Sequence, residues 1–128
     1  MMENLKKILI IDDEEDVLSY LSALFSNNNF HVISAPDGKE GIKKALSEKP
    51  DVITLDISMP EESGVKAIRE LQNNEITKNI PIIIITGVTS DFKRFIKARK
   101  QVHMPEGYFE KPIDRELLLK KVNELLNS

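Results

Sequence analysis

The stretch that decides the fold is residues 52–60, which read Val-Ile-Thr-Leu-Asp-Ile-Ser-Met-Pro. A mostly apolar run leads to one carboxylate, Asp56, and Pro60 follows four residues later. Buried parallel strands are near-continuous apolar runs, and a proline cannot donate a hydrogen bond to a neighbouring strand. The stretch therefore predicts a central strand with Asp56 at its carboxyl end, facing a crevice.

A second apolar run, residues 8–11, ends in the same way, in Asp12 and Asp13. Ligands of open α/β sheets bind outside the carboxyl ends of the strands. We therefore expect two strands to deliver three carboxylates to one edge of a sheet, and this is the main indication of function.

Composition narrows the class of protein. The chain has 128 residues and no cysteine, which predicts a single domain over residues 1–128 and excludes disulfides, zinc–thiolate sites and thiol nucleophiles. A formal charge of -3 argues against nucleic-acid binding, since such domains are usually basic. No signal peptide or membrane span is evident. We therefore expect a cytoplasmic protein with neither nucleic-acid nor membrane partners.

Apolar runs alternate with segments in which apolar residues recur at helical spacing, and this alternation predicts βαβ units. The expected strands are residues 7–12, 30–34, 52–56, 80–85 and 107–110. Asp37, Ser63 and Asp114 are expected to cap helices, and a further helix is expected to begin at Ser90 or Asp91.

Five such units predict a flavodoxin-like (βα)5 fold, a doubly wound parallel sheet with strand order 2-1-3-4-5. The residues expected to face the core from the helices are Val17, Leu18, Leu21, Leu24, Phe25, Ile42, Ala45, Leu46, Val65, Ile68, Leu71, Leu117, Leu118, Val122 and Leu125. Glu14, Glu15 and Asp16 are interpreted as acids that suit the positive end of the first helix dipole.

The strand order would gather Asp12, Asp13 and Asp56, with Thr86 and Lys111 beside them from the ends of strands four and five. Carboxylates held close repel each other unless a cation intervenes. Magnesium takes oxygen ligands and commonly uses one or two carboxylates together with phosphate oxygens. The backbone carbonyl of Ser58 is a candidate for a further ligand oxygen.

This set of residues has a specific chemical use, which is phosphoryl transfer. Aspartate carboxylates act as nucleophiles that form aspartyl-phosphate, while a metal and a lysine neutralise charge on the transferred group. Taken singly, Asp56 reads as a turn or cap residue, Thr86 as a turn hydroxyl and Lys111 as a surface charge. Their joint placement at strand ends favours the functional interpretation. His31 and His103 are not placed for catalysis.

The motifs ILIIDDEED, LDISMP with Gly64 eight residues after Asp56, IIIITG and YFEKP, in this order and spacing, resemble the response-regulator receiver domains of two-component signalling. The likeness covers essentially the whole chain. It implies that Asp56 is the phosphoacceptor and that Asp13 binds Mg²⁺ directly. It further implies that Asp12 acts mainly through water and that Ser58 gives its carbonyl to the metal.

The resemblance also implies a mechanism of switching. Thr86 would move toward the phosphoryl group, Lys111 would pair with it, and the rotamer of Tyr108 would follow Thr86. The donor would be a phosphohistidine on a sensor histidine kinase or a histidine phosphotransfer protein. Phosphorylation would change the face built from helix four, strand five and helix five, in a monomer or a phosphorylation-dependent dimer. In the family, the bond that corresponds to Lys111–Pro112 is cis.

Between Thr86 and Lys111 the chain departs from the usual family pattern. The segment is rich in Lys and Arg and then runs through residues 101–105, which predicts a short or displaced fourth helix. The lysines at 93, 97 and 100 are interpreted as a solvated face. Val88, two residues after Thr86, offers no hydrogen bond to an attacking water, which predicts slow self-dephosphorylation.

The predicted function is a signalling switch, not a turnover enzyme, and three alternatives are open. A degenerate receiver would bind partners without carrying phosphate. A phosphatase with an aspartate nucleophile would need an acid/base aspartate where this chain has Ser58. A flavin carrier on the same fold would have to place a flavin phosphate against the acidic residues 12–15, which would repel it.

Overall fold

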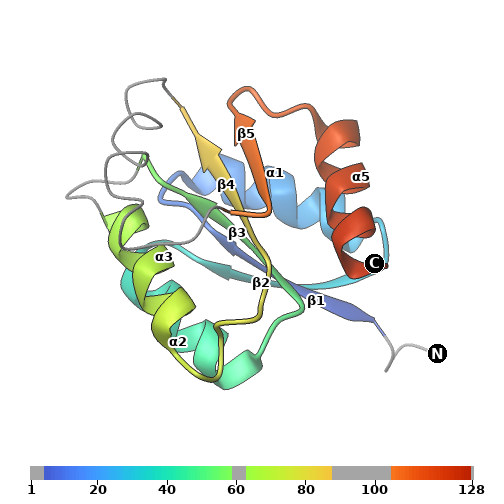
Figure 1. The fold of residues 1–128 in the computed structure, drawn as a ribbon. Helices are drawn as coiled ribbons and strands as arrows, with labels where there is room; N and C mark the ends of the chain where they lie inside the picture. Colours follow the sequence, from blue (N-terminus) through green and yellow to red (C-terminus); the bar gives the residue numbers. More distant parts are fainter. Residues whose placement is uncertain (1–4, 59–62, 88–104, 128) are drawn as a thin grey trace.

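The computed structural model describes residues 5–58, 63–87 and 105–127. Within them, five parallel strands form one sheet in the order β2-β1-β3-β4-β5 (Figure 1). This confirms the predicted flavodoxin-like α/β fold and its strand order.

The observed strands begin and end within about two residues of the predicted ones. The bounds of the strands and helices are β1 (Lys6–Ile11), α1 (Glu15–Ser26), β2 (Phe30–Ala35), α2 (Gly38–Glu48), β3 (Val52–Asp56), α3 (Ser63–Asn73), β4 (Ile82–Thr86), β5 (Gly107–Glu110) and α5 (Arg115–Leu126).

Helices cover both faces of the sheet, with α1 and α5 on one face and α2 and α3 on the other (Figure 1). Because side chains of a strand alternate between faces, Ile8 and Ile10 of β1 pack toward α1 and α5. Leu9 and Ile11 pack toward α2 and α3. Strands β3 and β4 are buried along their whole length, as expected for a central parallel pair.

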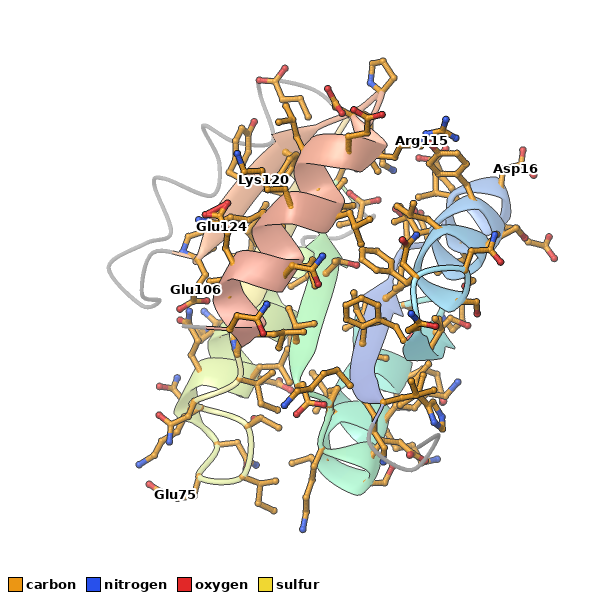
Figure 2. All side chains as sticks on the ribbon, turned by 90° about the vertical axis from the view of Figure 1, so that its right-hand side faces the viewer. Asp16, Glu75, Glu106, Arg115, Lys120 and Glu124 are labelled. Carbon is orange, nitrogen blue, oxygen red and sulfur yellow. The ribbon has the colours of Figure 1, made fainter. Side chains whose placement is uncertain are left out.

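Figure 2 views the molecule from the α5 side, where α5 and α1 lie next to each other. Arg115 and Asp16, near the N-terminal ends of these two helices, lie at the same end of the molecule. In a βαβ fold the helices begin where the strands end. The N-terminal ends of α1 and α5 therefore flank the edge at which the acidic residues gather.

Two of the predicted helix caps are confirmed. The Asp37 carboxylate accepts a hydrogen bond from the backbone N–H of Glu40, and Asp114 accepts bonds from the N–H groups of Glu116 and Leu117. Helix α3 begins at Ser63, but the side chain of that residue lies outside what is described. The Lys111–Pro112 bond is cis, as the resemblance implied.

One predicted core position is wrong. Leu117 is 55 % exposed, while Leu118 and Val122 of the same helix are fully buried and Leu125 packs against them. Each helical residue is rotated about 100° from its neighbour. Leu117 therefore lies off the stripe that positions 118, 122 and 125 share.

Several predictions lie outside the described residues. They concern Pro60, the helix expected from Ser90 or Asp91, the solvated lysines, Val88 and His103. In the described part of the chain, no helix combines the length and the apolar character that a membrane crossing requires.

Candidate functional site

The site is built where strands end. Asp12 directly follows β1, Asp56 is the last residue of β3, and Lys111 directly follows β5. Asp12 and Asp56 are each 1 % exposed. The backbone N–H of Lys111 donates to the carbonyl of Thr86, 2.9 Å away, so the end of β5 is attached to the end of β4 beside the two aspartates.

The Lys111 ammonium lies among three carboxylates. Its Nζ is 2.6 Å from Oε1 of Glu14, 3.1 Å from Oδ2 of Asp12 and 3.3 Å from Oδ2 of Asp56. Desolvation by burial lowers the pKa of Lys111. The hydrogen bond to Glu14 and the charge of Asp56 outweigh that effect, so the pKa of Lys111 is raised above its ordinary value. Lys111 is therefore a permanent cation in this site.

The two carboxylate oxygens of Asp56 have different partners. Oδ1 accepts hydrogen bonds from the backbone N–H of Ser58, at 2.8 Å, and from the Ser58 hydroxyl. Oδ2 faces the Lys111 ammonium. This arrangement fixes the carboxylate of Asp56 in one orientation, with one oxygen held by the following turn and the other turned to the cation.

The surroundings of Asp12 disfavour the charged form of its carboxyl group. Its Oδ1 accepts a hydrogen bond from the backbone N–H of Glu14, while the buried Oδ2 has no hydrogen-bond partner among the described residues although Nζ of Lys111 is 3.1 Å away. Desolvation by burial, reinforced by the charge of Asp56, raises the pKa of Asp12 to about 6. The Glu14 N–H and the Lys111 ammonium oppose this shift and do not cancel it.

These residues fit a hard divalent cation. Asp12, Asp13, Glu14 and Asp56 each bring a carboxylate oxygen within 4.8 Å of the others. Among the described side chains, three of these four carboxylates pair with the ammonium of Lys111, and one oxygen of Asp12 lacks a hydrogen-bond donor. An all-oxygen donor set is the one that Mg²⁺ prefers in proteins.

Thr86 and Tyr108, the two predicted switch residues, lie on adjacent strands. Thr86 ends β4, is fully buried, and follows Ile85, which pairs with Asp56. Tyr108 of β5 is partly buried, packs against the core cluster on the α2–α3 side, and places its hydroxyl 3.4 Å from Oε1 of Glu110. Thr86 therefore lies at the acidic edge, and Tyr108 lies further back along β5.

Glu14 is the residue whose contact the sequence interpretation missed. It was assigned with Glu15 and Asp16 to the helix dipole, and those two do lie in the first turn of α1. Glu14 instead occupies the N-cap position, where its side chain makes no capping hydrogen bond, and its carboxylate pairs with Lys111. Its position in the sequence could have indicated this contact, because Glu14 directly follows Asp12 and Asp13 at the sheet edge where Lys111 was also expected.

Gly64 allows α3 to start close to the site. A Cβ atom at this position would lie 2.6 Å from the backbone oxygen of Asp56 and 2.6 Å from Cα of Ile57. Such distances are too short for any side chain against rigid backbone. The spacing of Gly64 after Asp56 thus has a structural cause, because the first turn of α3 rests directly on the main chain that holds Asp56.

Comparisons with known proteins agree with this geometry. Residues 8–123 match the response regulator receiver domain family. The chain is 35 % identical over 120 residues to protein PilH of Pseudomonas aeruginosa, covering 94 % of this chain and 97 % of that protein. The chain is also 35 % identical over 118 residues to the CAI-1 autoinducer sensor kinase/phosphatase CqsS of Vibrio cholerae. That match covers 91 % of this chain but only 17 % of CqsS. The chain likewise spans 52 % of the response regulator ArlR of Staphylococcus saprophyticus, at 33 % identity over 94 % of this chain.

Solved structures show the same fold. The chemotaxis protein CheY4 of Vibrio cholerae superimposes with a TM-score of 0.83 at 30 % identity, covering 95 % of this chain and 99 % of that one. A response regulator receiver domain from Clostridium thermocellum gives 0.81 at 28 % identity, covering 96 % of this chain and 95 % of that one. On its sequence match, its strand order and the gathering of acids and lysine at one sheet edge, this chain belongs to the response regulator receiver domain family.

Proposed function

We propose that this chain is a phosphorylatable receiver domain, a single domain over residues 1–128, and that Asp56 is its phosphoacceptor. The observation that carries the proposal is the state of that carboxylate. It is buried at a strand end, is oriented by Ser58, and turns one oxygen to an ammonium 3.3 Å away. Membership of the receiver family supports the assignment.

The phosphoryl donor in this proposal is a phosphohistidine on a sensor histidine kinase or a histidine phosphotransfer protein. A likeness to part of a protein described as a sensor kinase/phosphatase supports a role in such signalling. In the transfer, a carboxylate oxygen of Asp56 attacks phosphorus. The P–N bond of the donor breaks with its electron pair passing to the imidazole, and a P–O bond forms.

Magnesium would be held by Asp12, Asp13, Asp56 and the backbone carbonyl of Ser58. When bound, it would neutralise charge on the phosphoryl oxygens. Lys111 would contribute a second positive charge, because its ammonium already lies beside Oδ2 of Asp56. The hydrogen bonds from Ser58 would keep the nucleophile from rotating away.

The output would be a shift between two pre-existing conformations, biased by the phosphoryl group. Thr86, buried at the end of the strand next to Asp56, is the residue placed to bond a phosphoryl oxygen. Its backbone carbonyl is hydrogen-bonded to Lys111, so a movement of Thr86 would reach β5 and Tyr108. The partner face would include β5, α5 and the segment that contains the predicted fourth helix, in a monomer or a phosphorylation-dependent dimer.

The test is intact mass after incubation with a small-molecule phosphodonor and Mg²⁺, with wild type and Asp56→Asn side by side. We expect one added phosphoryl group in the wild type, lost in the variant and lost when a chelator removes the metal. No adduct with any donor, a phosphorylated kinase included, would refute the proposal and favour a receiver that only binds partners.

A further inference from the structure

Glu14 makes the shortest of the three contacts to the Lys111 ammonium, at 2.6 Å. Its position differs from those of the other two carboxylates. The side chains of Asp12 and Asp56 are 2 % and 1 % exposed, whereas that of Glu14 is 59 % exposed. Glu14 therefore holds the ammonium from the solvent side, while the two aspartates hold it from the interior.

The Glu14 contact belongs to a closed ring of interactions. The backbone N–H of Glu14 donates to Oδ1 of Asp12, the Glu14 carboxylate accepts from Nζ of Lys111, and Nζ returns to Oδ2 of Asp12. Both the main chain and the side chain of Glu14 are thus fixed relative to the other two residues. The ring joins the end of β1 to the end of β5.

If the proposed function is right, phosphoryl transfer would break some of the three carboxylate contacts to Lys111 and keep others. Asp56 would carry the phosphoryl group and Asp12 would turn to the metal, so neither would be available to Lys111 as it is now. Glu14 alone of the three would keep its oxygen for the ammonium. Nζ reaches Glu14 and Asp56 at the same time, so the Glu14 contact does not draw the ammonium away from Asp56.

We propose that Glu14 is a positioning residue for phosphoryl transfer, which tethers the Lys111 ammonium where it meets the phosphoryl group on Asp56. It acts through Lys111 and does not itself touch the transferred group. Removal of its charge leaves the ammonium free to sample other positions, and the fraction of molecules with a correctly placed cation falls.

The test compares Glu14→Gln with Glu15→Gln. Both changes remove one negative charge at the start of α1. Glu15 is exposed and makes no ion pair with the described residues. Because Glu14 is largely exposed, its ion pair with Lys111 contributes only modestly. We therefore expect the rate of phosphorylation by a small-molecule donor at saturating Mg²⁺ to fall about threefold in Glu14→Gln. Glu15→Gln should stay within about 1.5-fold of wild type.

A double-mutant comparison tests whether Glu14 acts through Lys111. In a Lys111→Ala background, the further change Glu14→Gln should leave the residual phosphorylation rate unchanged, because the group that Glu14 positions is gone. A second threefold loss in that background would overturn the tether. An equal loss in Glu14→Gln and Glu15→Gln would also overturn it, because the effect would then be one of general charge.

A spectroscopic readout is independent of phosphorylation. In the metal-free protein, the ammonium protons of Lys111 are observed by nitrogen–proton NMR and assigned by their loss in Lys111→Arg. Glu14 covers the solvent side of the ammonium, so exchange of these protons with water should speed up about threefold or more in Glu14→Gln, but not in Glu15→Gln. Unchanged exchange would refute the tether. A wild type that takes no phosphoryl group would instead refute the proposed function.

Discussion

The contribution of Asp12 to the stability of the metal-free protein should fall as the pH rises from about 4 to 7. The pKa of Asp12 is raised from 3.8 to about 6 in the folded protein. The folded state therefore binds this proton more tightly than the unfolded state does. The resulting contribution to stability is fully present below pH 3.8 and is lost as the pH rises through about 6.

The size of this effect follows from the shift. One pKa unit corresponds to about 1.4 kcal/mol, so the change from 3.8 to about 6 sets an upper limit of about 3 kcal/mol. Screening by water at the open side of the site reduces the expected loss in the free energy of unfolding to about 1–2 kcal/mol. Mg²⁺ at one hundred times its dissociation constant would add back about 2.7 kcal/mol at neutral pH.

The assay is urea unfolding between pH 4 and 7 in the presence of a chelator, for wild type and Asp12→Asn. The variant lacks the titrating carboxyl group, so the difference between the two profiles reports Asp12 together with its interactions with the neighbouring charges. The free-energy difference should change by about 1–2 kcal/mol across this range, with the wild type losing stability relative to the variant. Two parallel profiles would refute the reasoning.

Two further predictions concern packing. Gly64→Ala should destabilise the protein by about 1–3 kcal/mol in urea unfolding, because the new methyl group would meet rigid backbone at 2.6 Å. The control is Gly87→Ala, because its methyl group would lie no closer than 3.8 Å to any atom outside the chain neighbours among the described residues. It should change stability by less than about 1 kcal/mol. Equal losses of stability in the two variants would contradict the argument. Thr54 and Thr77 are both 1 % exposed, but only the Thr77 hydroxyl has a hydrogen-bond partner among the described residues. Thr54→Val should therefore stabilise by up to about 1 kcal/mol and Thr77→Val destabilise by about 1–2 kcal/mol; a loss of stability in Thr54→Val would count against an unsatisfied hydroxyl.

The parts of the fold that follow from local pattern could be predicted from the sequence. The buried strands β3 and β4 are continuous apolar runs, and Asp37 and Asp114 cap helices at the positions where their residue types are favoured. The strand order then followed from the handedness of βαβ connections. Because parallel strands end at one edge, the meeting of Asp12, Asp56 and Lys111 also followed.

What could not be predicted depends on a choice among side-chain orientations. A glutamate after a strand can face solvent, cap a helix or reach a neighbouring cation, and sequence gives no energy difference among these. The structure shows that Glu14 reaches Lys111, a residue 97 positions away along the chain. The prediction that Leu117 faces the core was wrong for a related reason. A run of three leucines in α5 leaves open which of them faces the core.

The position of Lys111 among three carboxylates also bears on whether this protein needs its metal in order to fold. Many metal sites cannot form without their ion, because the ligands repel each other and the chain unfolds. Here the chain supplies an internal counterion, carried by the residue that directly follows the edge strand β5. The domain is thus expected to fold without a bound metal. Magnesium supply would then govern how readily the protein can be charged with phosphate, and its effect on folding would be added stability and not a requirement for the folded state.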